Sequence, residues 1–219
     1  MKIDSATINF LKELKDNNNK EWFDENRKRY EIARGNFSDL IASVITQMKQ
    51  FDHSLEGLEV KQTLFRINRD VRFSKNKSPY KTNFAASITA GGKKIARAGY
   101  YFHMDPDEMF YGGGWYMPDA TSLAAIRQEV DYNLKDFDAI LKKKSFKNIY
   151  SGLDDFKLKT KPKGYEVDNP AIEHLRQKSF IASATVTRKE VEKEGFDKLL
   201  VNAFENLYPL VAFLNKAVD

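Results

Sequence analysis

The chain has 219 residues, of which 42% are hydrophobic, 31% charged and 13% aromatic. This composition excludes an intrinsically disordered chain, and the length suits one large domain. The absence of cysteine excludes disulfides, thiolate metal sites and thiol nucleophiles. No run of about 18 apolar residues occurs, and Lys2, Asp4 and Asn9 interrupt the beginning of the chain. We therefore expect a cytoplasmic protein with neither a signal peptide nor a membrane span.

The first part of the chain, residues 1–55, has helical patterning. After Ser5, which can cap a helix, apolar residues recur at helical spacing. A second helix is expected over residues 21–34, and Gly35 is expected to end it. Residues 37–48 then predict a third helix with one apolar face.

The middle of the chain, residues 60–117, is expected to form a sheet. A loose alternation of apolar and polar residues predicts a strand over residues 63–73. Two further strands, over residues 85–89 and 95–104, are expected to form a hairpin around Gly91-Gly92, because paired glycines are typical of tight β-turns.

Two local features interrupt the regular pattern of this region. Ser78-Pro79 fits the start of a short helical turn, where free backbone N–H groups could face an anion. The strand predicted over residues 109–117 contains three consecutive glycines, Gly112, Gly113 and Gly114. Glycines weaken an ordinary strand, so we expect a bulge there or a place where a ligand approaches the backbone.

The last part of the chain, residues 118–219, has the pattern helix, strand, helix. A helix is expected to begin near Asp119 and to close at the lysines 142–144. Residues 179–187 are β-branched and alternating, and residues 196–218 repeat apolar side chains at helical spacing. The predicted fold class is α+β: a helical N-terminal portion, a mainly antiparallel central sheet and C-terminal helices packed on it, in a single domain.

The positive charge of the chain is concentrated in one segment. The net charge is +5, yet residues 61–97 contain ten basic residues and one acidic residue, a local charge of +9. The remainder of the chain therefore carries −4. This asymmetry favours an anionic partner that binds at the segment, and the acidic remainder favours a small anion over a long polyanion.

Residues 66–83 combine guanidinium, ammonium, hydroxyl and amide groups, which together suit an anion. Arginine forms two parallel hydrogen bonds to a phosphate or carboxylate, and lysine adds a mobile positive charge. The alternative interpretation is a solvated basic edge strand in which Asp70 pairs with an arginine. We predict that the anion contacts Arg66, Arg69, Arg72, Lys75 and Lys81.

The same segment resembles a known family. RINRDVRFSKNKSPYKTN at 66–83, AGYYFH at 98–103 and GGGWYMP at 112–118 are similar to motifs of the bacterial family catalogued as domain of unknown function 2461. Stretches near both ends extend the resemblance to nearly the whole chain. At Asn76 many relatives are expected to carry an acid, so this chain is more basic there. The resemblance implies one domain of that family and no catalytic residue.

Aromatic residues near the glycines suggest the walls of a pocket. Aromatic rings can stack on a base or a sugar, although most aromatic residues of strands are buried in a core. We predict that Tyr80, Tyr101, His103, Gly113 and Trp115 line the pocket.

Two other functions remain open. One is an enzyme that acts on a phosphorylated or acidic substrate with Asp70 or His103 as the acid or base, and the other is a nucleic-acid-binding module. His103, Asp105 and Asp107 could ligate a metal, but Asp105-Pro106-Asp107 is equally typical of a turn. The glycine-rich phosphate loops and the nucleophile-elbow motif do not occur. We predict neither a metal nor a cofactor.

Overall fold

The computed structural model describes residues 1–219 and consists of ten α-helices around one four-stranded antiparallel sheet. The fold class is α+β, as predicted. The strands follow one another across the sheet in chain order. They are β1 (Phe84–Ile88), β2 (Gly99–Met104), β3 (Met109–Trp115) and β4 (Phe180–Thr185).

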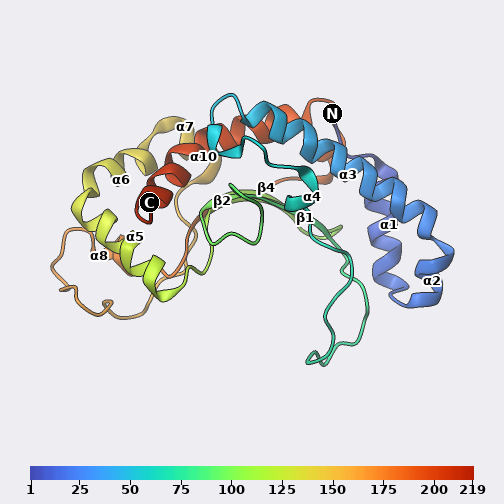
Figure 1. Ribbon diagram of the computed structural model, residues 1–219, viewed down its shortest axis with the longest axis horizontal. Coiled ribbons are helices and arrows are strands. Elements are labelled where there is room, and N and C mark those ends of the chain that lie inside the picture. Colours follow the sequence, from blue (N-terminus) through green and yellow to red (C-terminus); the bar gives the residue numbers. More distant parts are fainter.

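The helices form three groups along the chain: before β1, between β3 and β4, and after β4 (Figure 1). Before β1 lie α1 (Ser5–Asp16), α2 (Lys20–Glu25), α3 (Arg27–Met48), a 3-10 turn (His53–Leu55) and α4 (Val60–Thr63). Between β3 and β4 lie α5 (Ala120–Tyr132), α6 (Leu134–Lys142), α7 (Lys144–Tyr150) and α8 (Ile172–Leu175). After β4 lie α9 (Arg188–Val191) and α10 (Phe196–Lys216). None of these helices combines the length and the apolar composition that crossing a bilayer requires.

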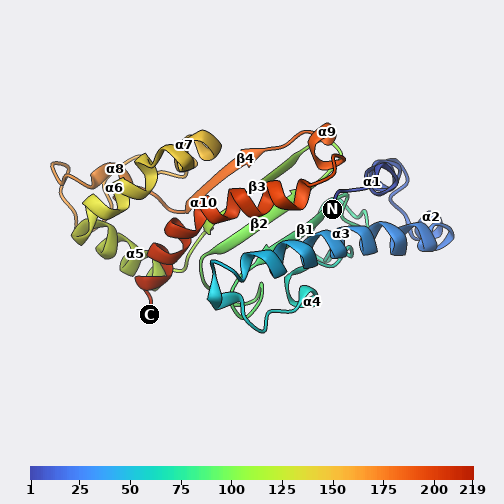
Figure 2. The same cartoon turned by 90° about the horizontal axis from the view of Figure 1, so that it is seen from above.

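Helices α3 and α10 run along one face of the sheet and bury it (Figure 2). Phe37 of α3 stacks on Phe102 of β2 with ring centroids 5.7 Å apart, and Phe204 of α10 lies 5.3 Å from Tyr100. Full burial of each such aromatic ring stabilises the fold by about 1.5–3 kcal/mol. One cluster of 47 buried residues extends from α1 to α10 through this face.

The opposite face of the sheet carries no helix. Figure 1 shows the sheet at the centre of an arch, with α1 and α2 at one end and α5, α6 and α8 at the other. Because side chains alternate along a strand, alternate residues point to this uncovered face, although Ala85 and Gly112 among them are buried. They are Ala85, Ser87, Tyr101, His103, Phe110, Gly112, Ile181, Ser183 and Thr185.

Both outer edges of the sheet are paired with neighbouring loops. Beside β1, the Phe65 N–H donates to the carbonyl oxygen of Ala85 at 3.1 Å. Beside β4, the Asp154 N–H donates to the carbonyl oxygen of Ile181 at 2.9 Å, and the Asp154 carboxylate accepts from the Ser183 N–H at 3.2 Å. The backbone groups that edge strands usually expose are thus partly occupied on both sides.

The N-terminal helices differ from the prediction at Gly35. Helix α3 runs through Gly35 without interruption, and the break lies earlier, at Asn26 between α2 and α3. A glycine inside a helix costs about 1 kcal/mol relative to alanine. Burial of apolar side chains on both sides of it, such as Ala33 and Phe37, outweighs that cost.

The strand predicted over residues 63–73 does not form, and the sheet begins at β1. Residues 66–82 instead form a narrow ribbon, here called the basic arm, that projects below the sheet beside β1 (Figure 1). Within it the Arg69 N–H donates to the Pro79 carbonyl at 2.9 Å and the Lys81 N–H to the Ile67 carbonyl at 2.8 Å. The helical turn predicted at Ser78-Pro79 is absent, because Pro79 belongs to this ribbon.

The remaining strands lie close to their predicted positions. Strands β1 and β2 form the predicted hairpin, but the connection between them is long. Within this connection, Gly91 and Gly92 have φ of +77° and +96°. No bulge occurs at the glycine run: Gly113 pairs in regular register with Tyr100 on one side and Ala182 on the other.

The C-terminal part follows the predicted order of helix, strand and helix. Asp119 caps α5 by accepting from the N–H groups of Thr121 and Ser122 at 2.9 and 3.0 Å. Helix α6 ends at Lys142, within the predicted lysine run, but a break at Asn133 divides the one predicted helix into α5 and α6.

Candidate functional site: the arm pocket and the uncovered face

A polar pocket of about 400 Å³, here called the arm pocket, lies between the basic arm and the end of α1. It is lined by Lys15, Asn18, Arg69, Asn76, Ser78, Tyr80, Lys81, Thr82 and Asn83. Three of these side chains are cationic and none is a carboxylate. Amide and hydroxyl groups supply the rest of the polar lining, so the pocket offers the hydrogen-bond donors that an anion needs.

The base of the arm is fixed to the N-terminal helices. The Tyr80 ring stacks on Phe23 of α2 with centroids 4.0 Å apart. The Asn18 side chain donates to the Tyr80 carbonyl and accepts from the Tyr80 N–H, both at 3.0 Å. Tyr80 belongs to the lining of the pocket, but because it is only 7% exposed, it anchors the arm and is not free to stack on a ligand.

Lys81 is half-buried at the border of the arm pocket. Its ammonium group lies 5.2 Å from the centroid of the Phe65 ring. Burial lowers the pKa of Lys81, and repulsion by Arg66 lowers it further, while no nearby carboxylate raises it. A desolvated cation without a counter-ion is unfavourable unless an anion compensates it.

The other predicted cations lie at different places along the arm. Arg69 lines the pocket and braces the arm by donating to the Ser78 carbonyl at 2.9 Å and to the Ser74 hydroxyl at 3.3 Å. Arg66, Arg72 and Lys75 are exposed and lie outside the lining of the pocket. The predicted set therefore does not converge on one anion.

Asp70 is neutralised by Arg72 at the end of the arm. The Arg72 Nε and Nη2 atoms donate to the two carboxylate oxygens at 2.9 and 2.7 Å. This bidentate pair holds the pKa of Asp70 below its usual value. A carboxylate of this kind is a poor general base, so the structure gives no support to Asp70 as a catalytic group.

His103 lies on the uncovered face, held at both ring nitrogens. Nδ1 is 3.0 Å from the Tyr101 hydroxyl, and Nε2 is 3.3 Å from the Asn83 amide nitrogen. Burial lowers the pKa of His103, although Asp105 and Glu108 oppose that shift. The imidazole is therefore neutral at pH 7, and Asn83, which also lines the arm pocket, connects it to that pocket.

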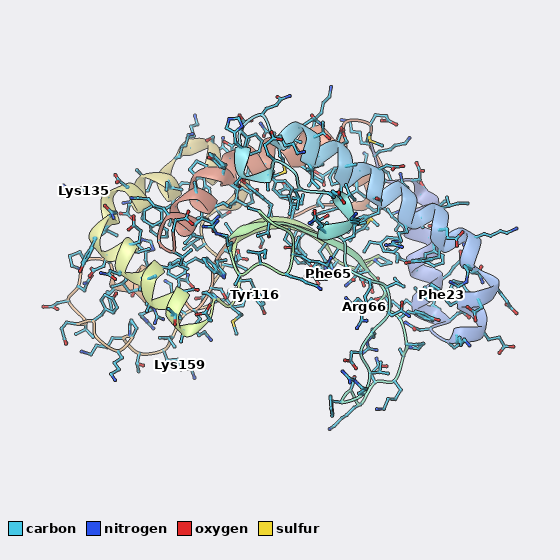
Figure 3. The ribbon with its side chains drawn as sticks, viewed as in Figure 1. Phe23, Phe65, Arg66, Tyr116, Lys135 and Lys159 are labelled. Atoms are coloured by element: carbon cyan, nitrogen blue, oxygen red, sulfur yellow. The ribbon has the colours of Figure 1, made fainter.

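Aromatic rings continue from Lys81 across the uncovered face. Phe65 lies 6.3 Å from Tyr101, Tyr101 lies 5.7 Å from Phe110, and Phe110 stacks on His103 at 4.9 Å. Figure 3 shows Phe65 beneath the sheet, next to Arg66. Sequence reasoning missed Phe65 and Phe110, although register would have revealed Phe110, which pairs directly with His103.

Gly113 and Trp115 lie away from the arm pocket. A Cβ atom on Gly113 would lie 2.4 Å from the Gly99 carbonyl oxygen and 2.7 Å from Cδ2 of Leu207 on α10. The glycine therefore permits close packing of α10 on the sheet, and the prediction that it admits a ligand is wrong. Trp115 is 5% exposed and belongs to the core.

The acidic residues near His103 form other contacts. Asp105 accepts from the Thr82 hydroxyl at 2.8 Å, and Asp107 pairs with Lys15. No group of three or more histidine, aspartate or glutamate side chains is arranged to hold a metal ion.

Comparison with known proteins identifies one family. A family model described as conserved hypothetical protein (DUF2461) matches residues 6–213. No curated protein and no solved structure shows significant similarity to the chain. The match includes the basic arm, the uncovered face and most of α10.

Proposed function

The chain belongs to the DUF2461 family, and from its site we propose that it binds a small ligand carrying a phosphate or carboxylate group in the arm pocket. The anionic group lies against Lys81 and Arg69. The Ser78 hydroxyl and the amide groups of Asn18 and Asn76 complete its shell of hydrogen-bond donors.

The observation that carries this proposal is the environment of Lys81. Most lysines keep their ammonium group in water, but this one is partly desolvated beside a second cation, Arg66, and a ring, Phe65. A cation–π contact offsets only part of the desolvation cost. A bound anion would neutralise Lys81 and raise its pKa, so the site is more favourable occupied than empty.

The aromatic rings next to Lys81 suit a planar part of the same ligand. Phe65 is 37% exposed, so part of the residue is accessible to a ligand. A ligand whose anionic group reaches Lys81 would bring its remaining atoms over Phe65 and toward Tyr101. Such a ligand combines one or two negative charges with an unsaturated ring or chain.

The test compares two neutral variants of the arm. Calorimetric titration of inorganic phosphate, pyrophosphate and a dicarboxylate into the protein should give binding that Lys81→Met weakens about tenfold or more, because a charge-assisted contact is lost. Lys75→Met is the matched control: Lys75 belongs to the same arm but is exposed and lies outside the pocket lining. Equal effects of the two substitutions, or no binding by the parent, would contradict the proposal.

A second candidate function, acid–base catalysis on the bound ligand, is favoured by the position of His103. A neutral imidazole accepts a proton, and here it is held between Asn83, at the pocket, and Tyr101, beside Phe65. The test substrate is p-nitrophenyl phosphate. His103→Gln should abolish its hydrolysis and leave phosphate binding intact, whereas absence of hydrolysis by the parent would remove this candidate.

A further inference from the structure

We infer that the uncovered face of the sheet binds single-stranded nucleic acid, with a backbone phosphate of that strand as the anion in the arm pocket. This inference rests on the anion-binding pocket of the proposed function, but it extends the ligand from a small anion, which the charge distribution of the sequence favours, to a polymer. It depends on two features outside the pocket: a second basic segment at the other end of the arch, and exposed aromatic rings between the two basic segments.

The second basic segment is the loop of residues 157–163. It contains four lysines and no acidic residue. Lys157 pairs with Glu173 and Lys161 with Glu166, whereas Lys159 and Lys163 are exposed and form no ion pair. The net charge of the chain does not reveal this segment, because acidic residues elsewhere in the sequence offset its four lysines.

The two basic segments lie at opposite ends of the uncovered face. Figure 1 shows the basic arm below β1 at one end and the loop between α7 and α8 at the other, and Figure 2 separates them along the same long axis. In Figure 3, Phe65 and Tyr116 lie below the sheet between Arg66 and Lys159. A flexible polyanion that follows the concave face meets positive charge where it enters and where it leaves.

Two of the aromatic residues between these charges are exposed, and two more are partly buried. Tyr116 is 64% exposed, with one edge of its ring against Phe156 at 5.9 Å, and Phe65 is 37% exposed. Tyr101 and Phe110 continue the series along the sheet. Rings of this kind form platforms on which unpaired bases stack, with little preference for sequence.

The arrangement favours a single strand over a duplex. In a duplex the base faces are stacked on one another, so they cannot reach the rings on the sheet. Two of the acids near the path are already engaged, since Asp70 pairs with Arg72 and Asp154 hydrogen-bonds to Ser183. Both carboxylates therefore already have partners within the protein.

The experiment measures fluorescence anisotropy of a labelled oligothymidylate of about 15 nucleotides, its oligouridylate equivalent and a matched duplex across salt concentrations. With about five phosphates neutralised, the logarithm of the single-strand association constant should fall with the logarithm of salt at a slope near −3.5. The single strands should bind more tightly than the duplex. Equal affinities would indicate a merely electrostatic surface and overturn the inference.

Single substitutions test the second basic segment and the exposed aromatic rings separately. Lys159→Glu should weaken binding and make the slope shallower, while Lys135→Glu, an exposed lysine of the same lobe that Figure 3 shows on the outer side, should leave both unchanged. Phe65→Ala and Tyr116→Ala should each weaken binding about tenfold without changing the slope, because stacking releases no ions. Equal behaviour of Lys159→Glu and Lys135→Glu would contradict the inference.

A comparison of phosphate binding with oligonucleotide binding distinguishes failure of this inference from failure of the proposed function. If phosphate binds in a Lys81-dependent way but the oligonucleotides do not bind, the inference is wrong and the pocket serves small ligands alone. If the oligonucleotides bind and Lys81→Met has no effect on them, the strand does not use the arm pocket and the inference in this form is also wrong.

Discussion

The Tyr101 hydroxyl and Nδ1 of His103 lie 3.0 Å apart on the one face of the sheet that no helix covers. The two residues are two positions apart on β2, so the pleat of the strand alone brings them to the same side. Both are partly buried, which raises the pKa of Tyr101 and lowers that of His103. At neutral pH the pair therefore consists of a protonated phenol and a neutral imidazole.

The titration of His103 tests this description. Its ring protons, followed by NMR, should titrate with a midpoint below the ordinary value of 6.5, because burial disfavours the imidazolium. The native state then binds fewer protons than the unfolded state between the two pKa values. The free energy of unfolding should be constant with respect to this group above pH 6.5 and should fall as the pH decreases through that window. His103→Gln should remove this part of the pH dependence, and a midpoint above 6.5 would refute the assignment.

Replacement of glycine by alanine is expected to have opposite effects on stability at Gly113 and at Gly35. Gly113→Ala should destabilise the protein by about 1–3 kcal/mol, because the new methyl group meets backbone and Leu207 without space to move. Gly35→Ala should stabilise it by about 0.5–1 kcal/mol, since Gly35 lies inside α3 and no atom lies within 4 Å of its Cβ position. Urea denaturation of both variants measures the difference, and a Gly113→Ala variant as stable as the parent would show that α10 packs differently.

Asn18 is expected to hold the arm in place. Asn18→Ala removes both hydrogen bonds to the Tyr80 backbone and should cost about 1–3 kcal/mol of stability. Amide hydrogen exchange should accelerate in residues 78–82 before it does in the sheet. Asn206→Ala is the control, because Asn206 is exposed on α10 and bonds only to its own helix. Unchanged exchange in the arm would mean that the Phe23–Tyr80 stack alone suffices.

The Arg72→Glu variant tests whether the anion binds at the tip of the arm or in the arm pocket. Arg72 is exposed and contacts Asp70 and the ring of Phe73, so its reversal should leave the thermal midpoint close to that of the parent. Phosphate affinity at the pocket should change by no more than about twofold, because exposed charges are screened by salt. A large loss of phosphate binding would place the anion near the tip and would favour the arginine set predicted from the sequence.

Much of the fold follows from periodicity in the sequence. The helices around residues 5–16 and 196–216, and the strands β1, β2, β3 and β4, were predictable because one face of each is buried and the apolar spacing is regular. The basic arm was mistaken for a strand because residues 63–73 alternate in the same way. Only Leu64 and Phe65, at the start of that stretch, pair with β1, whereas Arg69 pairs with Pro79 within the arm.

The candidate site was only partly predictable, since contacts distant in sequence create it. Lys81 and Arg69 were identified from charge, but Lys15 and Asn18 come from the end of α1, far from the arm in the sequence. Gly113 was misinterpreted because a glycine under a helix and a glycine under a ligand look alike in a sequence. Only the position of Leu207 distinguishes them.

The partly occupied edges of the sheet restrict how the protein can meet other chains. An incoming peptide adds to a sheet by pairing with an unoccupied edge, and the same geometry underlies amyloid-like templating. Here Phe65 occupies the β1 edge and Asp154 the β4 edge, the latter through both its backbone and its carboxylate. Strand addition would first have to displace these native loops. Backbone-templated assembly is therefore disfavoured.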